Sequence, residues 1–246
     1  MVRQTVDSEL ELQVGAAKVS KYAVSESGDT LEVTERPHGG LSLVLADGQQ
    51  SGRAAKVISS LVARKAITLL AEGVRDGAAA RATHDYLRTH RQGQVSCELA
   101  IASLDLETRT LVLSRNTHCP ALIVDGTRLR VWDEPSEAIG IHARTKPVIL
   151  ELPLLAPTWL ILFTDGILEA GQHNGAGFAL ADWVSTRLEQ GFASPAALAD
   201  ALLAEAMARD QGRPHDDMSV LVLGLLSRTS VDPARRLAMR FPMPPF

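Results

Sequence analysis

Hydrophobic positions follow two different periods in the first part of the chain. Residues 41–46 (LSLVLA) are a short apolar run that ends in Asp47-Gly48, which predicts a buried strand followed by a turn. From Gly52 to Glu72 the apolar residues recur every three or four positions, which predicts a helix ended by Gly73. We expect the helix to turn one apolar face to the core: Val57, Ile58, Leu61, Val62 and Leu69.

The rest of the chain alternates between strand and helix patterns. Further helices are predicted over residues 76–90, 178–189 and 195–209, the last with Ser194 as its cap and Pro195 at its first position. Strands are predicted over residues 10–22, 97–104, 110–114, 121–124, 129–132, 148–152, 159–163 and 218–226. Strands in a middle block with helices in pairs favour α+β layers, and two antiparallel sheets covered by helices fit this pattern. The strand order stays open.

Composition narrows the class of protein. The chain has 246 residues and a net charge of −4, with no basic cluster typical of nucleic-acid binding. Residues 1–12 lack an apolar signal core, and the apolar stretch 148–163 is interrupted by Glu151 and two prolines, so we expect strands there and no membrane span. Two cysteines make no disulfide framework. We expect a cytoplasmic protein with one domain over residues 1–227 and a C-terminal extension over 228–246.

Five acidic residues stand where apolar stretches meet turns: Asp29, Asp47, Asp165, Asp216 and Asp217. Strand ends that are far apart in sequence can meet at one edge of a sheet. Carboxylates gathered there would repel one another and raise their own pKa values unless a cation neutralised them. Hard divalent cations prefer such oxygen ligands. The pattern therefore predicts a metal-dependent enzyme.

Each Asp-Gly pair also has a simpler interpretation as a turn. Asp125 lies between two short strands and is expected in a hairpin, and Asp76 precedes a helix and is expected to cap it. Asp47 and Asp165 differ because each ends a strongly apolar strand. Taken singly, each of these two is better explained as a turn, but together with Asp29 and the Asp216-Asp217 pair they favour a functional site.

Four motifs, in order, resemble a known family. They are GDTLEV (28–33), ADGQQSGRAA (46–55), FTDGILEA (163–170) and DDMSVLVL (216–223). They resemble the metal-dependent protein serine/threonine phosphatases (PPM family), and SRNTHCPALIVDG (114–126) and AIGI (138–141) resemble segments of its SpoIIE-like branch. The similarity runs over about residues 10–226, and the compact layout is most similar to RsbX-type stressosome phosphatases. It implies a four-layer α-β-β-α sandwich with two central antiparallel sheets flanked by helices.

The resemblance also implies roles for the acidic residues. Asp47 would bridge two Mn²⁺ or Mg²⁺ ions with help from the Gly48 carbonyl, Asp165 and Asp216 would complete one ion, and Asp29 would hold the other. Catalysis is thereby assigned to Asp29, Asp47, Asp165 and Asp216, and Asp217 receives a supporting place among the metal ligands. The expected reaction is hydrolysis of phosphoserine or phosphothreonine by a metal-activated water, on a bacterial signalling partner such as a STAS-domain or stressosome protein.

Some residues depart from the family pattern or have plainer explanations. Gln49 and Gln50 follow the central Asp-Gly pair, where relatives often carry a histidine able to act as a general acid. A catalytically weak or silent module that binds a phosphoprotein therefore remains as an alternative. A metal-dependent phosphodiesterase that uses the same ions on a small molecule is a further alternative. His118 and Cys119 are expected to be a packed strand end, and Arg36 is expected to be solvated in a turn.

Overall fold

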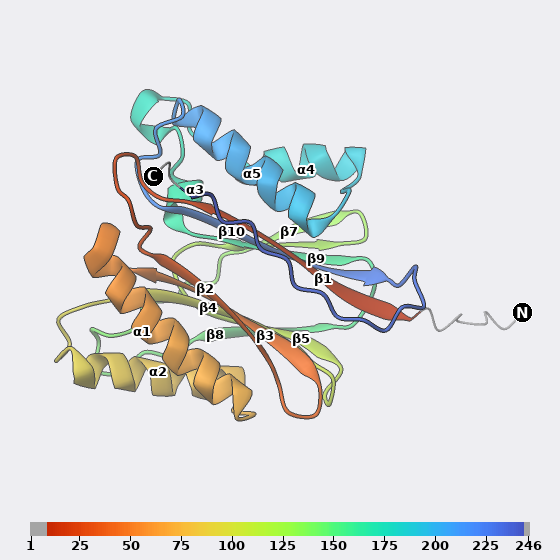
Figure 1. The fold of residues 1–246 in the computed structure, drawn as a ribbon, viewed down its shortest axis with the longest axis horizontal. Helices are drawn as coiled ribbons and strands as arrows, with labels where there is room; N and C mark the ends of the chain where they lie inside the picture. The colour runs from red at the N-terminus through yellow and green to blue at the C-terminus, as the bar shows by residue number, and fades with distance from the viewer. Residues whose placement is uncertain (1–8, 244–246) are drawn as a thin grey trace, which may run out of the picture.

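The computed structural model describes residues 9–243, and within this range two antiparallel five-stranded sheets pack face to face (Figure 1). Helices α1 (Gly52–Ala71) and α2 (Asp76–His90) cover one sheet. Helices α4 (Leu180–Gln190) and α5 (Pro195–Arg209) lie over the other, while α3 (Asp165–Leu168) and η1 (Gln172–Asn174) are short turns. The predicted α+β class with four α-β-β-α layers is confirmed.

The strand order, which periodicity left open, joins the two ends of the domain. One sheet has the order β1 (Leu10–Val19), β10 (Met218–Ser227), β9 (Thr158–Phe163), β6 (Ala121–Asp125) and β7 (Arg128–Trp132). The other has the order β2 (Asp29–Glu35), β3 (Gly40–Gly48), β4 (Cys97–Asp105), β5 (Thr110–Asn116) and β8 (Val148–Pro153). Most predicted elements match in type and differ by at most three residues at their ends.

Strand β3 shows how the sheet period decides where polar side chains point. Leu43 and Leu45 belong to the core between the two sheets, whereas Val44 and Ala46 pack in the core beneath α1 and α2. Successive side chains on a strand point to opposite faces, so Asp47 continues the row of Leu43 and Leu45. Its carboxylate therefore enters the space between the sheets at one end of the sandwich.

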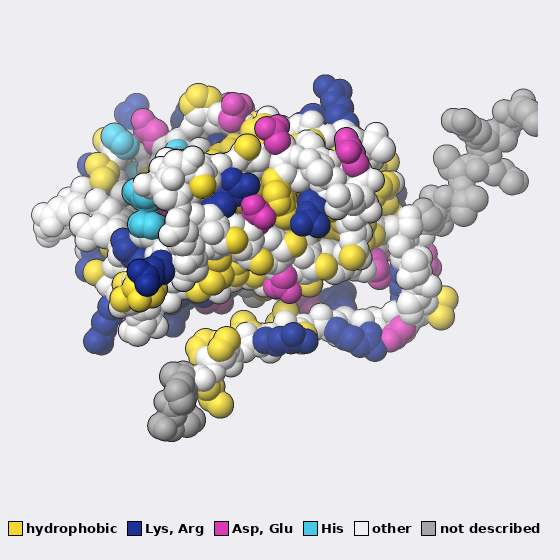
Figure 2. Space-filling model, turned by 90° about the horizontal axis from the view of Figure 1, so that it is seen from above, with side chains coloured by type: hydrophobic (Ala, Val, Ile, Leu, Met, Phe, Trp, Pro, Cys, Tyr) yellow, Lys and Arg dark blue, Asp and Glu magenta, His cyan; other side chains and the backbone are white. Residues whose placement is uncertain are grey.

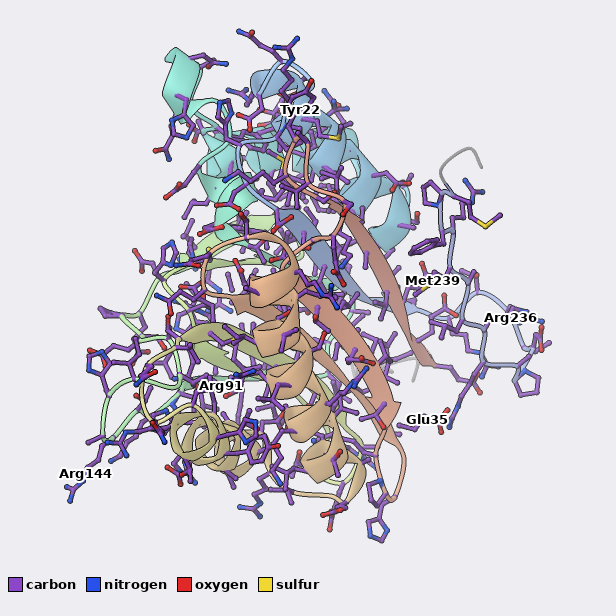
Figure 3. All side chains as sticks on the ribbon, turned by 60° about the vertical axis from the view of Figure 1, so that its left-hand side comes forward. Tyr22, Glu35, Arg91, Arg144, Arg236 and Met239 are labelled. Carbon is purple, nitrogen blue, oxygen red and sulfur yellow. The ribbon has the colours of Figure 1, made fainter. Side chains whose placement is uncertain are left out.

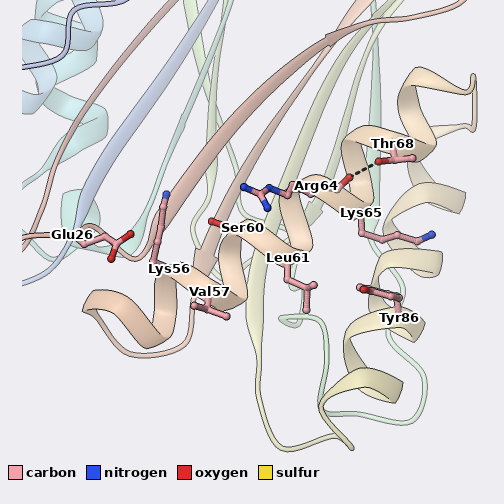
Figure 4. Close-up of a pocket in the computed structure, with 9 residues that line it drawn as sticks. All are labelled: Glu26, Lys56, Val57, Ser60, Leu61, Arg64, Lys65, Thr68 and Tyr86. Carbon is pink, nitrogen blue, oxygen red and sulfur yellow. Dashed lines mark hydrogen bonds between the residues drawn. The ribbon is translucent and has the colours of Figure 1, made fainter.

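The buried face of α1 differs from the predicted one. Ala55, Ile58 and Val62 lie in the core, but Val57 is 50% exposed and Leu61 is only partly buried. Val57 and Leu61 instead line an open groove of about 730 Å³ along the outer side of α1, with Tyr86 of α2 at its far end (Figure 4). Ala55 on the inner face lets the first turns of the helix lie close to β3, and Val57 is left outside.

Two further expectations about polar residues were wrong. The side chain of Arg36 is buried, and its guanidinium donates to the hydroxyls of Ser42 and Ser103 and to the carboxylate of Asp76 at 3.1, 3.3 and 3.4 Å. Asp76 is the first residue of α2, with Arg75 at the cap position, and Ser103 donates to it. Asp76 is therefore no helix cap: it anchors the start of α2 to the sheet through a buried ion pair.

Beyond β10, residues 228–243 have no regular secondary structure and run outside the sandwich. Arg235 contacts Glu35 at 2.7 Å, and Arg236 and Met239 lie beside the domain in Figure 3. Residues 1–8 and 244–246, which belong to the predicted domain and extension, lie outside the described residues. In the described part of the chain, no helix has the length and apolar character needed to cross a membrane.

Candidate active site

Three acidic side chains form a row across the end of one sheet. Asp29 of β2 is the register partner of Asp47 of β3, and Asp47 is the register partner of Glu98 of β4. Residues directly opposite each other in antiparallel strands point to the same face, with Cβ atoms about 5 Å apart. Asp29, Asp47 and Glu98 therefore face the same space between the two sheets.

The opposite sheet holds the Asp29 carboxylate in place. Thr164, which follows β9, and Ser219 of β10 donate hydroxyl hydrogen bonds to Oδ2 of Asp29 at 3.0 and 2.6 Å. Lys18 and Lys56 hold the backbone, since both Nζ atoms donate to the Asp29 carbonyl, at 3.0 and 2.7 Å. Oδ1 of Asp29 is buried and has no hydrogen-bond partner among the described residues. A buried, unpartnered carboxylate oxygen is costly and indicates that a ligand completes its environment.

Asp165 and Asp216 reach the same end of the sandwich from the other sheet. Asp165 follows β9 and begins α3, and Asp216 lies just before β10, the neighbouring strand. Gly166 allows this approach, because a Cβ built there would lie 2.2 Å from the carbonyl oxygen of Asp217. The two segments can therefore pack backbone to backbone only with glycine at this position.

Burial and mutual repulsion disfavour the charged forms of these aspartates. Burial raises the pKa of Asp29 and of Asp47, and the charges of Asp29, Asp165 and Glu98 raise that of Asp47 further. Burial, together with the charges of Asp216 and Glu98, raises the pKa of Asp165 to about 6. A bound divalent cation would reverse this balance, since it favours ionised oxygen ligands. The oxygen-only donor set and the unpartnered oxygen of Asp29 thus fit hard metal ions.

Asp217 is placed differently from its neighbour. Its buried carboxylate accepts backbone hydrogen bonds from Lys21 at 2.9 Å and from Gly28 at 2.8 Å. Both oxygens are thereby used to fasten the loop that leads into β2. Asp217 supports the position of Asp29 through this loop, while Asp29, Asp47, Asp165 and Asp216 supply the carboxylates at the site.

Gly48 lies at the end of β3, where the backbone of α1 packs against the strand. A Cβ built on Gly48 would lie 2.1 Å from the carbonyl oxygen of Ala55. After it, Gln49 accepts a hydrogen bond from the backbone N–H of Ser96 at 3.0 Å, and Gln50 adopts a positive φ of 72°. The two glutamines therefore form a turn into α1 that supplies no ionisable group.

Sequence reasoning missed Glu98 and misjudged His118. Glu98 lies on the same face of β4 as Ala100 and Ala102, which are buried between the sheets. A charged residue at a position of the strand that faces the core was therefore the signal available in the sequence. Its carboxylate contacts Nδ1 of His118 and accepts from the hydroxyl of Thr117. The side chain of His118 is 54% exposed, so it is no packed strand end.

Cys119 and the other histidines near this end are engaged elsewhere. Cys119 is buried, and burial raises the pKa of its thiol. Histidine side chains gather at one end of the face shown in Figure 2. The rings of His173 and His215 lie 4.5 Å apart, and Nδ1 of His215 is 3.3 Å from the carboxylate of Asp210.

Comparisons with known proteins agree with the fold. The model of the family Stage II sporulation protein E (SpoIIE) matches residues 37–226. Among curated proteins, none matches the chain significantly.

Solved structures share the fold at low identity. A Bacillus subtilis structure of the PP2C phosphatase domain and a regulatory fragment of SpoIIE has a TM-score of 0.76 and 22% identity, over 90% of this chain and 64% of that one. The chain therefore spans less than two thirds of that neighbour. RsbX in complex with magnesium has a TM-score of 0.67 and 13% identity, over 88% of this chain and 98% of that one. The RsbU and RsbW domains of Rv1364c from Mycobacterium tuberculosis have a TM-score of 0.69 and 17% identity, over 89% and 61%. By its family match and its fold, the chain belongs to the SpoIIE family of PP2C-like (PPM) proteins.

Proposed function

We propose that the chain is a metal-dependent phosphoprotein phosphatase that hydrolyses phosphoserine or phosphothreonine. The observation that carries this proposal is the convergence of Asp29, Asp47, Asp165 and Asp216 from both sheets, with a buried oxygen of Asp29 left without a partner. Such a cluster is unfavourable in the empty protein and favourable around divalent cations.

These four aspartates, with the Gly48 carbonyl, would hold two Mn²⁺ or Mg²⁺ ions, as in the family they resemble. When bound, such ions neutralise phosphate oxygens and acidify an attacking water. The chain's own part is to orient the ligands. Thr164 and Ser219 fix one oxygen of Asp29, and the register of β2 and β3 fixes Asp47 beside it. Preorganised charge and positioning are the main requirements of phosphoryl transfer.

A covalent route through the protein is disfavoured by the state of its thiols. The thiolate is the reactive form of cysteine, and burial raises the pKa of both Cys97 and Cys119. Cys119, the nearer in sequence to His118, is therefore a neutral thiol at physiological pH. This supports direct attack by water on phosphorus.

The proposed partner is a phosphorylated STAS-domain or stressosome protein in the cytoplasm. The supporting observation is that the solved structures with this fold include RsbX and an RsbU domain. The family resemblance associates such proteins with bacterial signalling. Phosphate release from a phosphoserine STAS-domain protein, with Mn²⁺, with Mg²⁺ and with chelator, tests the proposal. Tight binding of the phosphoprotein without any release would instead identify a silent binding module.

A further inference from the structure

The imidazole of His118 is held at the rim of the aspartate cluster by one carboxylate. Nδ1 of His118 contacts Oε1 of Glu98, and the backbone N–H of His118 donates to the same oxygen at 3.1 Å. The hydroxyl of Thr117 donates to the second oxygen of Glu98. Glu98 therefore fixes both the position and the tautomer of the ring, and Nε2 is the nitrogen left for another partner.

This contact places the ring next to the reacting centre of the proposed site. Glu98 is the strand neighbour of Asp47, so the order across this edge is Asp29, Asp47, Glu98 and then His118. Glu98 is 20% exposed and His118 is 54% exposed, so the ring lies on the solvent side of the carboxylates. A phosphorylated side chain entering from solvent would meet the imidazole beside the aspartates.

The charges around the ring favour its protonated form. The hydrogen bond that the ring donates to Glu98 raises the pKa of His118, and the charges of Glu98, of Asp165 and of Glu169 just after α3 act in the same direction, against a lowering by burial. A carboxylate that holds one ring nitrogen and stabilises the imidazolium is a recurring arrangement for proton transfer.

We propose that His118 is the general acid of the reaction and that Glu98 is its positioning residue; this rests on the phosphatase function proposed above. The water oxygen forms a bond to phosphorus while the bond between phosphorus and the seryl or threonyl oxygen breaks, with its electron pair on that oxygen. Nε2 of His118 gives its proton to this oxygen, so the alcohol leaves neutral. The attacking water loses a proton, and the imidazole regains one from solvent.

Three other basic side chains near the aspartates are already engaged. Lys18 and Lys56 both donate to the carbonyl of Asp29, and His215 pairs with Asp210. The turn after Asp47, which carries Gln49 and Gln50, has no proton donor with a suitable pKa. His118 thus fills a role that this turn leaves open.

The test compares two leaving groups in His118→Asn. A phosphoserine peptide releases an alkoxide that needs a proton, whereas p-nitrophenyl phosphate releases an anion that is stable near neutral pH. We expect the variant to lose about 100-fold or more on the peptide and less than about 3-fold on the aryl ester. His142→Asn is the matched control, because His142 is also exposed and lies 3.9 Å from a carboxylate, that of Glu137. Equal losses on both substrates, or no loss on either, would overturn the proposal.

Two readouts do not depend on activity. In the metal-free protein, the NMR signal of His118 should titrate above the usual histidine range, and Glu98→Gln should move it down. The Mn²⁺ affinity measured by calorimetry should change by less than about 3-fold in His118→Asn, because His118 is not assigned to hold or orient a metal ligand. Loss of a group that does orient metal ligands typically lowers the affinity about 10-fold or more. His118→Gln serves if the first variant fails to fold. A wild type without activity on either substrate defeats the phosphatase function itself, whereas an active wild type with an unaffected variant defeats only the role of His118.

Discussion

Asp29 and Asp47 are register partners across β2 and β3, and their carboxylates share the space between the two sheets. Two carboxylates that share such a space repel each other when both are ionised, unless another group compensates their charge. The fold nevertheless maintains the pair, with hydroxyls from the opposite sheet on one oxygen of Asp29. The stability of the empty domain is therefore coupled to what the cluster binds.

The metal-free domain should become less stable as the pH rises. The folded-state pKa of Asp165 is about 6, above the value of about 4 expected in the unfolded chain, and that of Asp47 is raised further. Because the folded state favours the protonated carboxyl groups, their raised pKa values contribute stability that is fully present below pH 4. This contribution is lost as the pH rises through 6 and beyond. Urea unfolding in EDTA between pH 4.5 and 7.5 should show this decline.

Divalent cations should have the opposite effect, because they bind the deprotonated ligands of the folded state. Saturating Mn²⁺ should raise the unfolding midpoint more at pH 7.5 than at pH 5. An equal shift at both pH values would contradict the assignment of the carboxylates with raised pKa values to the metal site.

Asp216 and Asp217 should respond in opposite ways to substitution. Asp217→Ala removes the acceptor of two backbone N–H groups and should cost about 2 kcal/mol or more of unfolding free energy. Asp216→Asn removes a charge from the repelling cluster, so the metal-free domain should keep its stability while Mn²⁺ affinity falls. Denaturation in EDTA measures the loss of stability, and titration calorimetry measures the loss of Mn²⁺ affinity. A stability loss in Asp216→Asn with an affinity loss confined to Asp217→Ala would contradict the roles assigned to the two residues.

The buried Arg36–Asp76 pair should be a major contributor to the stability of the α2 side of the domain. Asp76→Ala leaves the guanidinium buried without its countercharge, which typically costs about 3–5 kcal/mol. Asp232→Ala, which removes the exposed partner of Arg236, is the matched control and should leave the urea midpoint nearly unchanged. Equal costs in urea unfolding would show that the buried pair has no special weight.

The sequence allowed most elements to be predicted because their periods are strong. Helix α5 begins at Pro195 and ends at Arg209 as expected, with Ser194 accepting a hydrogen bond from Ala197. The face of α1 was predicted less well, because hydrophobicity favours Val57 while close packing selects the smaller Ala55. Side-chain volume, which periodicity ignores, decided that face.

The acidic motifs indicated which residues meet, but not what each carboxylate contacts. Asp216 and Asp217 are adjacent and chemically identical, and only the backbone of the Lys21–Gly28 loop distinguishes them. Glu98 carries no motif, and its importance depends on the pairing of β4 with β3, which local sequence does not encode. Long-range strand pairing was therefore the missing information.

The most direct test of the phosphatase function is Mn²⁺-dependent phosphate release from a phosphoserine STAS-domain protein by wild type and Asp165→Asn. Asp125→Asn is the control, since Asp125 belongs to the Asp-Gly hairpin between β6 and β7. We predict release by wild type and by Asp125→Asn, loss with chelator, and loss in Asp165→Asn. Release that persists in Asp165→Asn, or no release by a folded, Mn²⁺-bound wild type, would contradict it.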